Sequence, residues 1–512
     1  MIGPIKAKAA DSARLLRGIG TTAIAQICVI GSVFFQYWFI RHYWSINDLG
    51  EYSQVMRVCG VLEWVVLLVL PVALTRELAN RLSEPGPANR RTFIRTGLAL
   101  GALFLGLWVG MLMAFPRQGA VFLFGNERFE IWIPPFCVLL SGHALCLMVS
   151  SIARGIMAFH LANWMQFLYA AAFPAFLLLA GRDIEVKQIV ILLGAGATSL
   201  AIFVYLAFFR RDPAPDAAGS TQGGELSHRS AAATLLAYGT PRLATMACIG
   251  VQSLILPWLV NRQGGSQVLV ALNSLLGIIA ASTILVAPLG LVMLPHLSRL
   301  KAIGAKEEAG RHMSKILTYA ILLGGAESLA ALALLHPVIT LWLGAEIARY
   351  SPLLVACALA IPGFLVMEVM RNPLDAVSAV PWNAITYGCG AMSTMALFGA
   401  ARYWLNCTLD MAAALGMAGG ISIAAAICLL VGRHFYSIKI TDACVLKSAV
   451  VWLGGVLVLT AGYAWMAPLP RSAAGIVVVV VYMAVLARYS PAWITDMAPA
   501  RLRPCFEKMR RK

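Results

Sequence analysis

Four charged side chains lie inside long apolar stretches of the sequence. They are one basic and three acidic residues: Arg57, Glu63, Glu327 and Glu368. A charge in a membrane-spanning helix costs about 2.5–3.5 kcal/mol on insertion scales, so each of the four is a functional candidate. Arginine matches phosphate geometry with paired donors and stays charged in a medium of low dielectric constant. A desolvated carboxyl can hold a proton or a cation.

The spacing of these charged residues indicates which of them can form an ion pair. Glu368 precedes Arg371 by three residues, which places both on one face of a helix and predicts an ion pair. Its expected role is structural, to fix the turn at residues 372–373. Arg57 and Glu63 are six residues apart and should face different ways. Glu63 and Glu327 are candidate coupling-ion sites; alternatively, they are neutral, hydrogen-bonded carboxyls that hold helices together.

The sequence lacks the residue patterns of catalytic, metal-binding and nucleotide-binding sites. There is no HExxH motif, no carboxylate pair at catalytic spacing and no phosphate-binding glycine-rich loop. The eleven cysteines include no CxxC motif and show no metal-like spacing. His143, His296 and His336 stand isolated at helix ends or in apolar runs. We therefore predict a protein with no catalytic residues, no metal site and no cofactor, and no ATP hydrolysis by this chain alone.

The apolar runs that hold the charges are each long enough to cross a bilayer. The composition is 60% hydrophobic and 12% charged over 512 residues. A bilayer core about 30 Å thick needs about 20 apolar residues of helix, and helices satisfy their own backbone hydrogen bonds there. The sequence predicts an all-α polytopic membrane protein with about fourteen spans: 19–40, 55–75, 96–115, 131–152, 162–181, 188–209, 241–261, 268–295, 316–342, 351–370, 382–401, 411–431, 446–466 and 473–488.

Basic residues predict the orientation of these spans. Cytoplasmic loops are rich in Lys and Arg. With the N-terminus inside, 30 of the 40 lie in cytoplasmic segments or at the adjoining helix ends, 9 lie in periplasmic segments, and Arg57 lies within a span. Both termini should therefore be cytoplasmic. The net charge of +17 follows from this bias, and because no soluble domain presents a basic face, we expect no nucleic-acid partner.

The sequence also indicates a duplication. Residues 210–240 contain a polar stretch rich in Pro, Gly and Ser that reads as a cytoplasmic linker. Segments on either side of it match in type and topological place: 18–21 with 239–242, 71–81 with 288–299, and 154–158 with 371–376, at offsets of 221, 217 and 217 residues. We predict two pseudo-symmetric six-helix lobes, residues 1–209 and 241–431, followed by two helices and a basic tail in residues 432–512. Transporters built from repeats place the substrate between their halves.

Three short segments resemble a known superfamily. They are the Leu-Gly-Glu-Tyr sequence at residues 49–52, the Leu-Pro-His-Leu-Ser-Arg sequence at residues 294–299 and the segment of residues 336–344. All three are similar to marks of the multidrug/oligosaccharidyl-lipid/polysaccharide (MOP) exporter superfamily. The chain looks most like its polysaccharide-transporter branch, the Wzx-type flippases of lipid-linked O-antigen and exopolysaccharide repeat units. The resemblance covers about the whole chain, and its motifs are mostly topological.

The resemblance implies a flippase in the bacterial inner membrane that moves a polyprenyl-diphosphate-linked oligosaccharide by alternating access. In that superfamily the first, second, seventh and eighth helices line the cavity. Arg57, Arg242 and Arg17 are then candidates for the diphosphate path, and Gln26, Gln252 and Asn273 for glycan contacts. Alternatively, Arg17 and Arg242 are headgroup anchors, and the polar residues only hold helices together. The implied partners are the lipid-linked oligosaccharide, membrane lipids and the polysaccharide polymerase or ligase machinery.

Three alternatives stay open. A cation-coupled multidrug exporter of the same superfamily usually has twelve helices and an acidic site in its first helix, and the first span here has no Asp or Glu. A lipid II exporter shares the fourteen-helix layout, but its opening segment near the first helix is not evident. A membrane glycosyltransferase or ligase that uses the same lipid would need large periplasmic loops, and the loops here are short.

Overall fold

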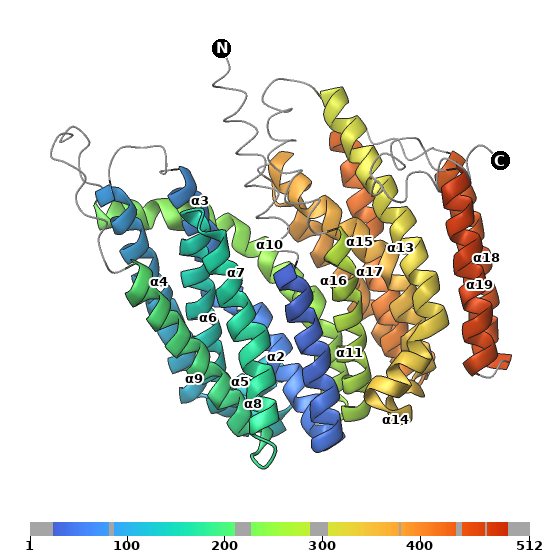
Figure 1. Ribbon diagram of the computed structural model, residues 1–512, viewed down its shortest axis with the longest axis horizontal. Coiled ribbons are helices and arrows are strands. Elements are labelled where there is room, and N and C mark those ends of the chain that lie inside the picture. The colour runs from blue at the N-terminus through green and yellow to red at the C-terminus, as the bar shows by residue number, and fades with distance from the viewer. Residues whose placement is uncertain are drawn as a thin grey trace. The chain divides into compact units, whose positions relative to one another are not determined.

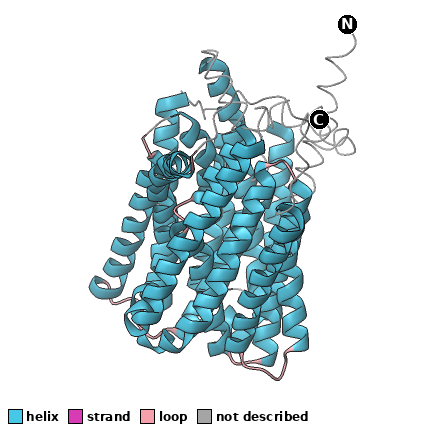
Figure 2. Ribbon diagram, turned by 90° about the vertical axis from the view of Figure 1, so that its left-hand side faces the viewer, coloured by secondary structure: helices cyan, strands magenta, loops and turns pink. Residues whose placement is uncertain are grey.

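The computed structural model describes residues 24–80, 87–209, 227–286, 306–377, 380–436, 443–465 and 468–489. Across these ranges the chain is made of helices and short connections and holds no strand (Figure 2). The predicted all-α membrane class is confirmed. The chain divides into two compact units. The first holds residues 1–250 and 261–264, and the second holds residues 251–260 and 265–512.

The first unit is a group of helices coloured blue to green in Figure 1. Its elements are Ile24–Tyr43, α2 (Ile46–Val66), α3 (Leu70–Asn80), α4 (Pro87–Ala114), α5 (Pro116–Phe124), η1 (Glu127–Trp132), α6 (Ile133–Gly155), α7 (Phe159–Phe167), η2 (Leu168–Ala172), α8 (Phe173–Ala180), α9 (Val186–Val204), η3 (Tyr205–Phe209) and most of α10 (His228–Arg262). The central helix is α6. Its backbone approaches that of α9 so closely at Gly142 and Gly194 that neither position has room for a Cβ atom.

The second unit contains the remaining helices, green to red in Figure 1. They are α11 (Ser266–Ser282), η4 (Thr283–Leu285), α13 (Lys306–Leu343), α14 (Ala345–Ala348), α15 (Ser351–Val377), α16 (Trp382–Gly399), η5 (Ala400–Trp404), α17 (Leu409–Tyr436), α18 (Ala443–Trp465) and α19 (Pro468–Tyr489). The last two pack on α13, where the Tyr482 hydroxyl donates to the Leu322 carbonyl at 3.0 Å. Leu329, Leu332, Ala358 and Leu459 form a buried cluster with Tyr482.

The described helices match the predicted spans in position. Ten of them are long and apolar enough to cross a membrane, or eleven if the bent pair α2–α3 is one span. Three shorter apolar helices cover Ser266–Ser282, Lys447–Ala461 and Ala473–Val485. Every predicted span overlaps one of these helices, while the exact number of fourteen crossings stays a prediction. Large apolar side chains such as Leu107, Phe176 and Leu457 are exposed on the outer faces, as expected of surfaces that contact lipid.

Two predicted boundaries are wrong. The linker was expected to extend to residue 240, but α10 already begins at His228. The Ser227 hydroxyl accepts from the Ser230 amide at 3.2 Å, as an N-cap does, and the alanines that follow favour a helix. The turn expected at residues 372–373 is also absent, because α15 runs through Pro373 to Val377. The Tyr436 hydroxyl donates to the Pro373 carbonyl at 2.8 Å, which helps to hold this part of the helix in place.

Candidate functional site

The second span of the first unit is broken in the middle. The sequence predicted one continuous helix over 55–75, but α2 and α3 meet at an angle of 53°. Leu68 and Val69 connect them with positive φ angles of 48° and 59°. A left-handed conformation costs about 1–2 kcal/mol for a residue other than glycine, and it is a marked outlier for β-branched Val69. Discontinuous helices form the substrate and ion sites of many transporters.

Helix α10 packs directly against this break. A Cβ atom at Gly239 would lie 2.6 Å from the Leu68 carbonyl oxygen, so only glycine fits there. Next to Gly239, the Tyr238 ring is contacted by two guanidinium groups. The Arg242 guanidinium is 3.8 Å from its centroid and the Arg76 guanidinium is 4.3 Å from it. The break in the second span is therefore flanked by two arginines that share one aromatic ring.

Arg57 lies in α2, on the other side of the break from Arg76, and is half-buried. It interacts electrostatically with Tyr37 of the first helix, which itself hydrogen-bonds with Ser53. The guanidinium is thus held among polar groups within the unit, which differs from an anchor that reaches out to lipid headgroups.

A second polar network lies beside Tyr37. The Tyr52 hydroxyl donates to Gln36 Oε1 at 2.5 Å, and Gln36 Nε2 donates to Ser32 Oγ at 3.0 Å. The Ser32 hydroxyl donates in turn to the Ala171 carbonyl at 2.9 Å. These bonds connect the first helix, α2 and the π-helical segment η2, and so fix the packing of the helix that carries Arg57.

Glu63 faces a histidine from the central helix α6. Its Oε2 atom is 3.9 Å from His143 Nδ1, and the two side chains are 12% and 13% exposed. This separation is too long for a hydrogen bond, and Glu63 Oε2 has no hydrogen-bond partner among the residues described. The His143 ring packs edge-on against Tyr169, with centroids 5.3 Å apart. His143, which stands isolated in the sequence, therefore lies beside the Glu63 carboxyl in the structure, without a hydrogen bond between them.

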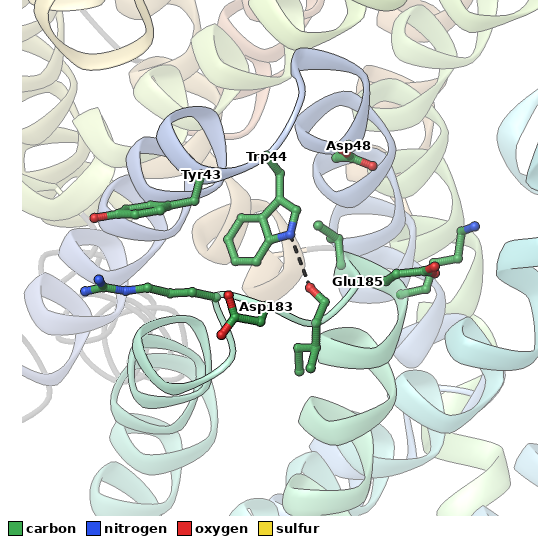
Figure 3. Close-up of a pocket in the computed structure, with 9 residues that line it drawn as sticks. Tyr43, Trp44, Asp48, Asp183 and Glu185 are labelled. Carbon is green, nitrogen blue, oxygen red and sulfur yellow. Dashed lines mark hydrogen bonds between the residues drawn. The ribbon is translucent and has the colours of Figure 1, made fainter.

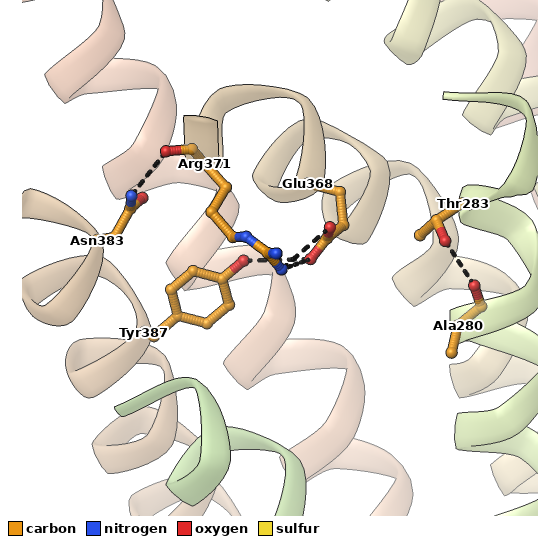
Figure 4. A network of polar contacts seen from close by, with 6 residues as sticks. All are labelled: Ala280, Thr283, Glu368, Arg371, Asn383 and Tyr387. Atoms are coloured by element: carbon orange, nitrogen blue, oxygen red, sulfur yellow. Dashed lines mark hydrogen bonds and ion pairs between the residues drawn. The ribbon is translucent and has the colours of Figure 1, made fainter. Parts of the chain in front are cut away.

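The second unit holds a polar network at the end of α15 (Figure 4). Arg371 Nη1 is 3.2 and 3.4 Å from the two carboxylate oxygens of Glu368, so the ion pair expected from the spacing is present. The Tyr387 hydroxyl donates to Glu368 at 3.5 Å, and Asn383 Nδ2 donates to the Arg371 carbonyl at 2.7 Å. Because the helix continues beyond Arg371, the pair ties α15 to α16 instead of fixing a turn.

Each of the other predicted site residues that the structure describes lies within one of the two units. Arg17 lies outside the described residues. Gln26 is half-buried on the first helix, and Asn273 is fully buried in the second unit. Gln252 packs against Gly390, and its Oε1 atom accepts no hydrogen bond in the described part of the chain. The same holds for Oε2 of Glu327, so a coupling or glycan role for these residues stays a prediction.

Sequence reasoning missed the break and the arginine pair around Tyr238. One signal for the break was Pro71, which has no amide to bond to the Leu67 carbonyl and disfavours a helical conformation at Leu70. In the structure the Leu67 carbonyl instead accepts from the Leu70 amide at 2.8 Å. The stacking of Arg76 on Tyr238 joins segments about 160 residues apart, and no local pattern in the sequence signals such a contact.

The fold is similar to that of several solved transporters. The inward closed conformation of the lipid II flippase MurJ matches with a TM-score of 0.68 over 91% of this chain and 98% of that chain, at 14% identity. The fold is that of the MOP transporters. An inward-facing multidrug resistance MATE family transporter of this superfamily matches with a TM-score of 0.63 and 15% identity, over 81% and 98% of the two chains.

A MOP superfamily transporter from Pyrococcus furiosus, described as having a binding pocket of reverse polarity, also has this fold. It matches with a TM-score of 0.61 and 14% identity, over 82% of this chain and 95% of its own. No protein-family model matches the sequence, and no curated protein matches it either. At such low identities the likeness concerns the fold, and the choice of substrate has to be argued from the residues of this chain.

Proposed function

We propose that the protein is a flippase that moves a polyprenyl-diphosphate-linked oligosaccharide, an O-antigen or exopolysaccharide repeat unit, from the cytoplasmic to the periplasmic leaflet by alternating access. The MOP transporter fold supports a transporter as the general class. The observation that carries the substrate class is the half-buried Arg57 in a broken membrane span. A guanidinium in the interior of a span suits a phosphate ligand far better than it suits the cationic amphiphiles that drug exporters carry.

The arginines of the first unit would give the diphosphate a path. In the second span, Arg57 precedes the break and Arg76 follows it. Arg76 and Arg242, which belongs to α10, both stack on Tyr238. Cation–π contact uses only the faces of these guanidinium groups. Arg242 Nη1 also donates to the Tyr238 carbonyl at 3.4 Å, which leaves its other N–H groups available as donors. We propose that Arg76 and Arg242 receive the diphosphate at the cytoplasmic mouth and that Arg57 binds it deeper in the protein. Arg17 remains a further candidate for the mouth.

The carboxyl–imidazole pair is the best candidate for energy coupling. Glu63 and His143 are both titratable, lie 3.9 Å apart on helices α2 and α6 and are largely shielded from solvent. A buried pair of this kind can take up a proton on one side of the membrane and release it on the other when the surrounding helices move. We propose proton coupling at Glu63, in a protein of the bacterial inner membrane with both termini in the cytoplasm.

Arg57 is the residue on which to test the diphosphate path. In a strain that lacks the protein, we expect Arg57→Ala to lower surface polysaccharide at least tenfold, since a charged bidentate contact contributes about 1.5–3 kcal/mol. Arg57→Lys should recover only part of it, because the ammonium keeps the charge and loses the paired donors. Arg117→Ala is the matched control, since that arginine is 63% exposed in a surface pair with Glu127. All variants are compared at equal membrane abundance.

The same strain separates the proposed function from its rivals. Loss of surface polysaccharide with lipid-linked repeat units trapped in the cytoplasmic leaflet supports the flippase. Unchanged polysaccharide with altered resistance to cationic dyes would point to a drug exporter. Repeat units that reach the periplasmic leaflet but are not joined onward would point to a ligase. Full polysaccharide from the Arg57→Ala variant would refute the path through this arginine.

A further inference from the structure

A cavity opens between two connections of the first unit, well apart from Arg57. It has a volume of about 520 Å³ and is lined by Tyr43, Trp44 and Asp48 and by residues 182–187, which lead from α8 into the start of α9. Its volume is within the range of about 300–1,000 Å³ that is typical of small-molecule sites. Figure 3 shows the Trp44 ring in the middle of this pocket, with Tyr43, Asp48, Asp183 and Glu185 arranged around it.

The aromatic side of the pocket is held rigidly. Trp44 Nε1 donates to the Ile184 carbonyl at 3.2 Å, which fixes the plane of the indole and joins the two connections. Tyr43 stacks on Phe39 with ring centroids 4.4 Å apart. The Arg182 guanidinium lies 5.0 Å from the Tyr43 centroid. The pocket thus presents an ordered apolar surface that does not need to rearrange before a ligand binds.

The charged side chains that line the other side of the pocket have few partners within the described part of the protein. The side chains of Asp183, Glu185 and Lys187 make no hydrogen bond or ion pair with any other residue that the structure describes. Asp48 uses its Oδ2 atom to accept from the Ser45 amide and hydroxyl, at 3.1 and 2.7 Å. Three carboxylates and two basic groups therefore surround the Trp44 ring, and most of their donors and acceptors are available to a ligand.

This combination selects against ions of either sign. Three carboxylates repel a phosphate or a lipid phosphodiester, and Arg182 and Lys187 oppose the binding of a cation. A neutral polyhydroxylated ring fits both sides of the pocket. Its hydroxyls donate to carboxylates and accept from Lys and Arg, while its C–H face packs on the indole, which is large and apolar.

We propose that this pocket is a carbohydrate-binding site for a short neutral glycan. The two connections are on the side that the sequence predicts to be periplasmic, so the site would receive the glycan part of the transported lipid after translocation. That role rests on the proposed function, whereas the binding of sugar at this site does not. The pocket is distinct from the arginine path, whose residues lie elsewhere in the unit.

The test is binding of soluble sugars to the full-length protein in nanodiscs. The probes are maltotriose, mannotriose and N-acetylated chitotriose, and binding is followed by saturation-transfer-difference NMR of the sugar C–H protons. At least one probe should bind, and Trp44→Ala should weaken its binding at least tenfold. The double variant Asp183→Asn/Glu185→Gln should weaken it at least fivefold. Glu127→Gln, which removes an exposed carboxylate from another connection, should leave binding unchanged.

The Arg57→Ala variant separates this proposal from the proposed function. It should keep sugar binding while polysaccharide export is lost. If sugars bind but no variant changes polysaccharide export, only the proposed flippase function is refuted. If export depends on the protein but none of the three sugars binds, only the carbohydrate site is refuted. Equal binding by the Trp44→Ala variant would also overturn it. So would saturable binding of calcium or of glycerophosphocholine at this pocket that sugars do not displace.

Discussion

Gly239 gives a sharp test of how α10 packs on the break in the second span. A methyl group there would lie 2.6 Å from the Leu68 carbonyl oxygen, whereas ordinary van der Waals contact begins near 3.4 Å. Gly239→Ala must therefore push the two backbones apart by about 0.8 Å. A side chain could rotate away from such a contact, but a carbonyl in a left-handed segment cannot.

The size of the effect follows from two opposing contributions. Forcing a methyl group into a packed site costs about 1–3 kcal/mol, and alanine gains about 1 kcal/mol over glycine within a helix. The matched control is Gly60→Ala in α2, where no atom lies within 4 Å of the added methyl. Because both variants gain the same helix propensity, the difference between them isolates the clash. We expect Gly239→Ala to be less stable than Gly60→Ala by about 1–3 kcal/mol.

The assay is thermal unfolding of the purified protein in detergent micelles, with both variants measured beside the unmodified protein. A lower midpoint for Gly239→Ala and an unchanged or higher one for Gly60→Ala support the packing of α10 on the break. Equal midpoints for the two variants would show that the segment around Leu68 moves freely, and the argument from the close approach would then fail.

Two further predictions concern titration and backbone strain. Glu63→Gln keeps the shape of the side chain but removes the titratable group that faces His143, so polysaccharide export in the deletion strain should fall at least tenfold. Glu327→Gln should reduce export less. Full export from Glu63→Gln would exclude proton coupling at Glu63. Met157 has a φ of 61° and is 57% exposed, so Met157→Gly should raise the free energy of unfolding by about 0.5–1 kcal/mol. Asn406→Gly, at a φ of 50°, should gain less because asparagine tolerates this conformation, and equal midpoint shifts for the two would contradict the strain argument.

The fold could be predicted from the sequence because the bilayer imposes it. A span must be apolar for about 20 residues, and this signal located the helices long enough to cross a membrane, such as the predicted span 131–152 against α6 (Ile133–Gly155). The short helices α5 and α14 between spans carry no such signal. Hydropathy says little about where a helix ends once it leaves the apolar layer. For this reason α10 begins at His228 and α13 at Lys306, well before the predicted starts at residues 241 and 316.

The site could be predicted only where its signals are local. Glu368 and Arg371 form their ion pair as the three-residue spacing indicates. The pairing of Glu63 with His143 depends on how α2 packs against α6, which no pattern within either helix reveals. The charge of Arg57 in an apolar run was visible, but its neighbour Tyr37 comes from another helix.

The break in the second span explains why these residues occur together. Leu68 and Val69 hold a conformation that costs about 1–2 kcal/mol for each residue, and Val69 is fully buried, so the surrounding packing must maintain it. A continuous helix would avoid this cost and would fix Arg57 and Arg76 in one rigid rod. Two half-helices instead place the arginines on separate segments that meet at 53°. The proposed passage of a diphosphate from one arginine to the next would use this separation, because each arginine could then move with its own half-helix.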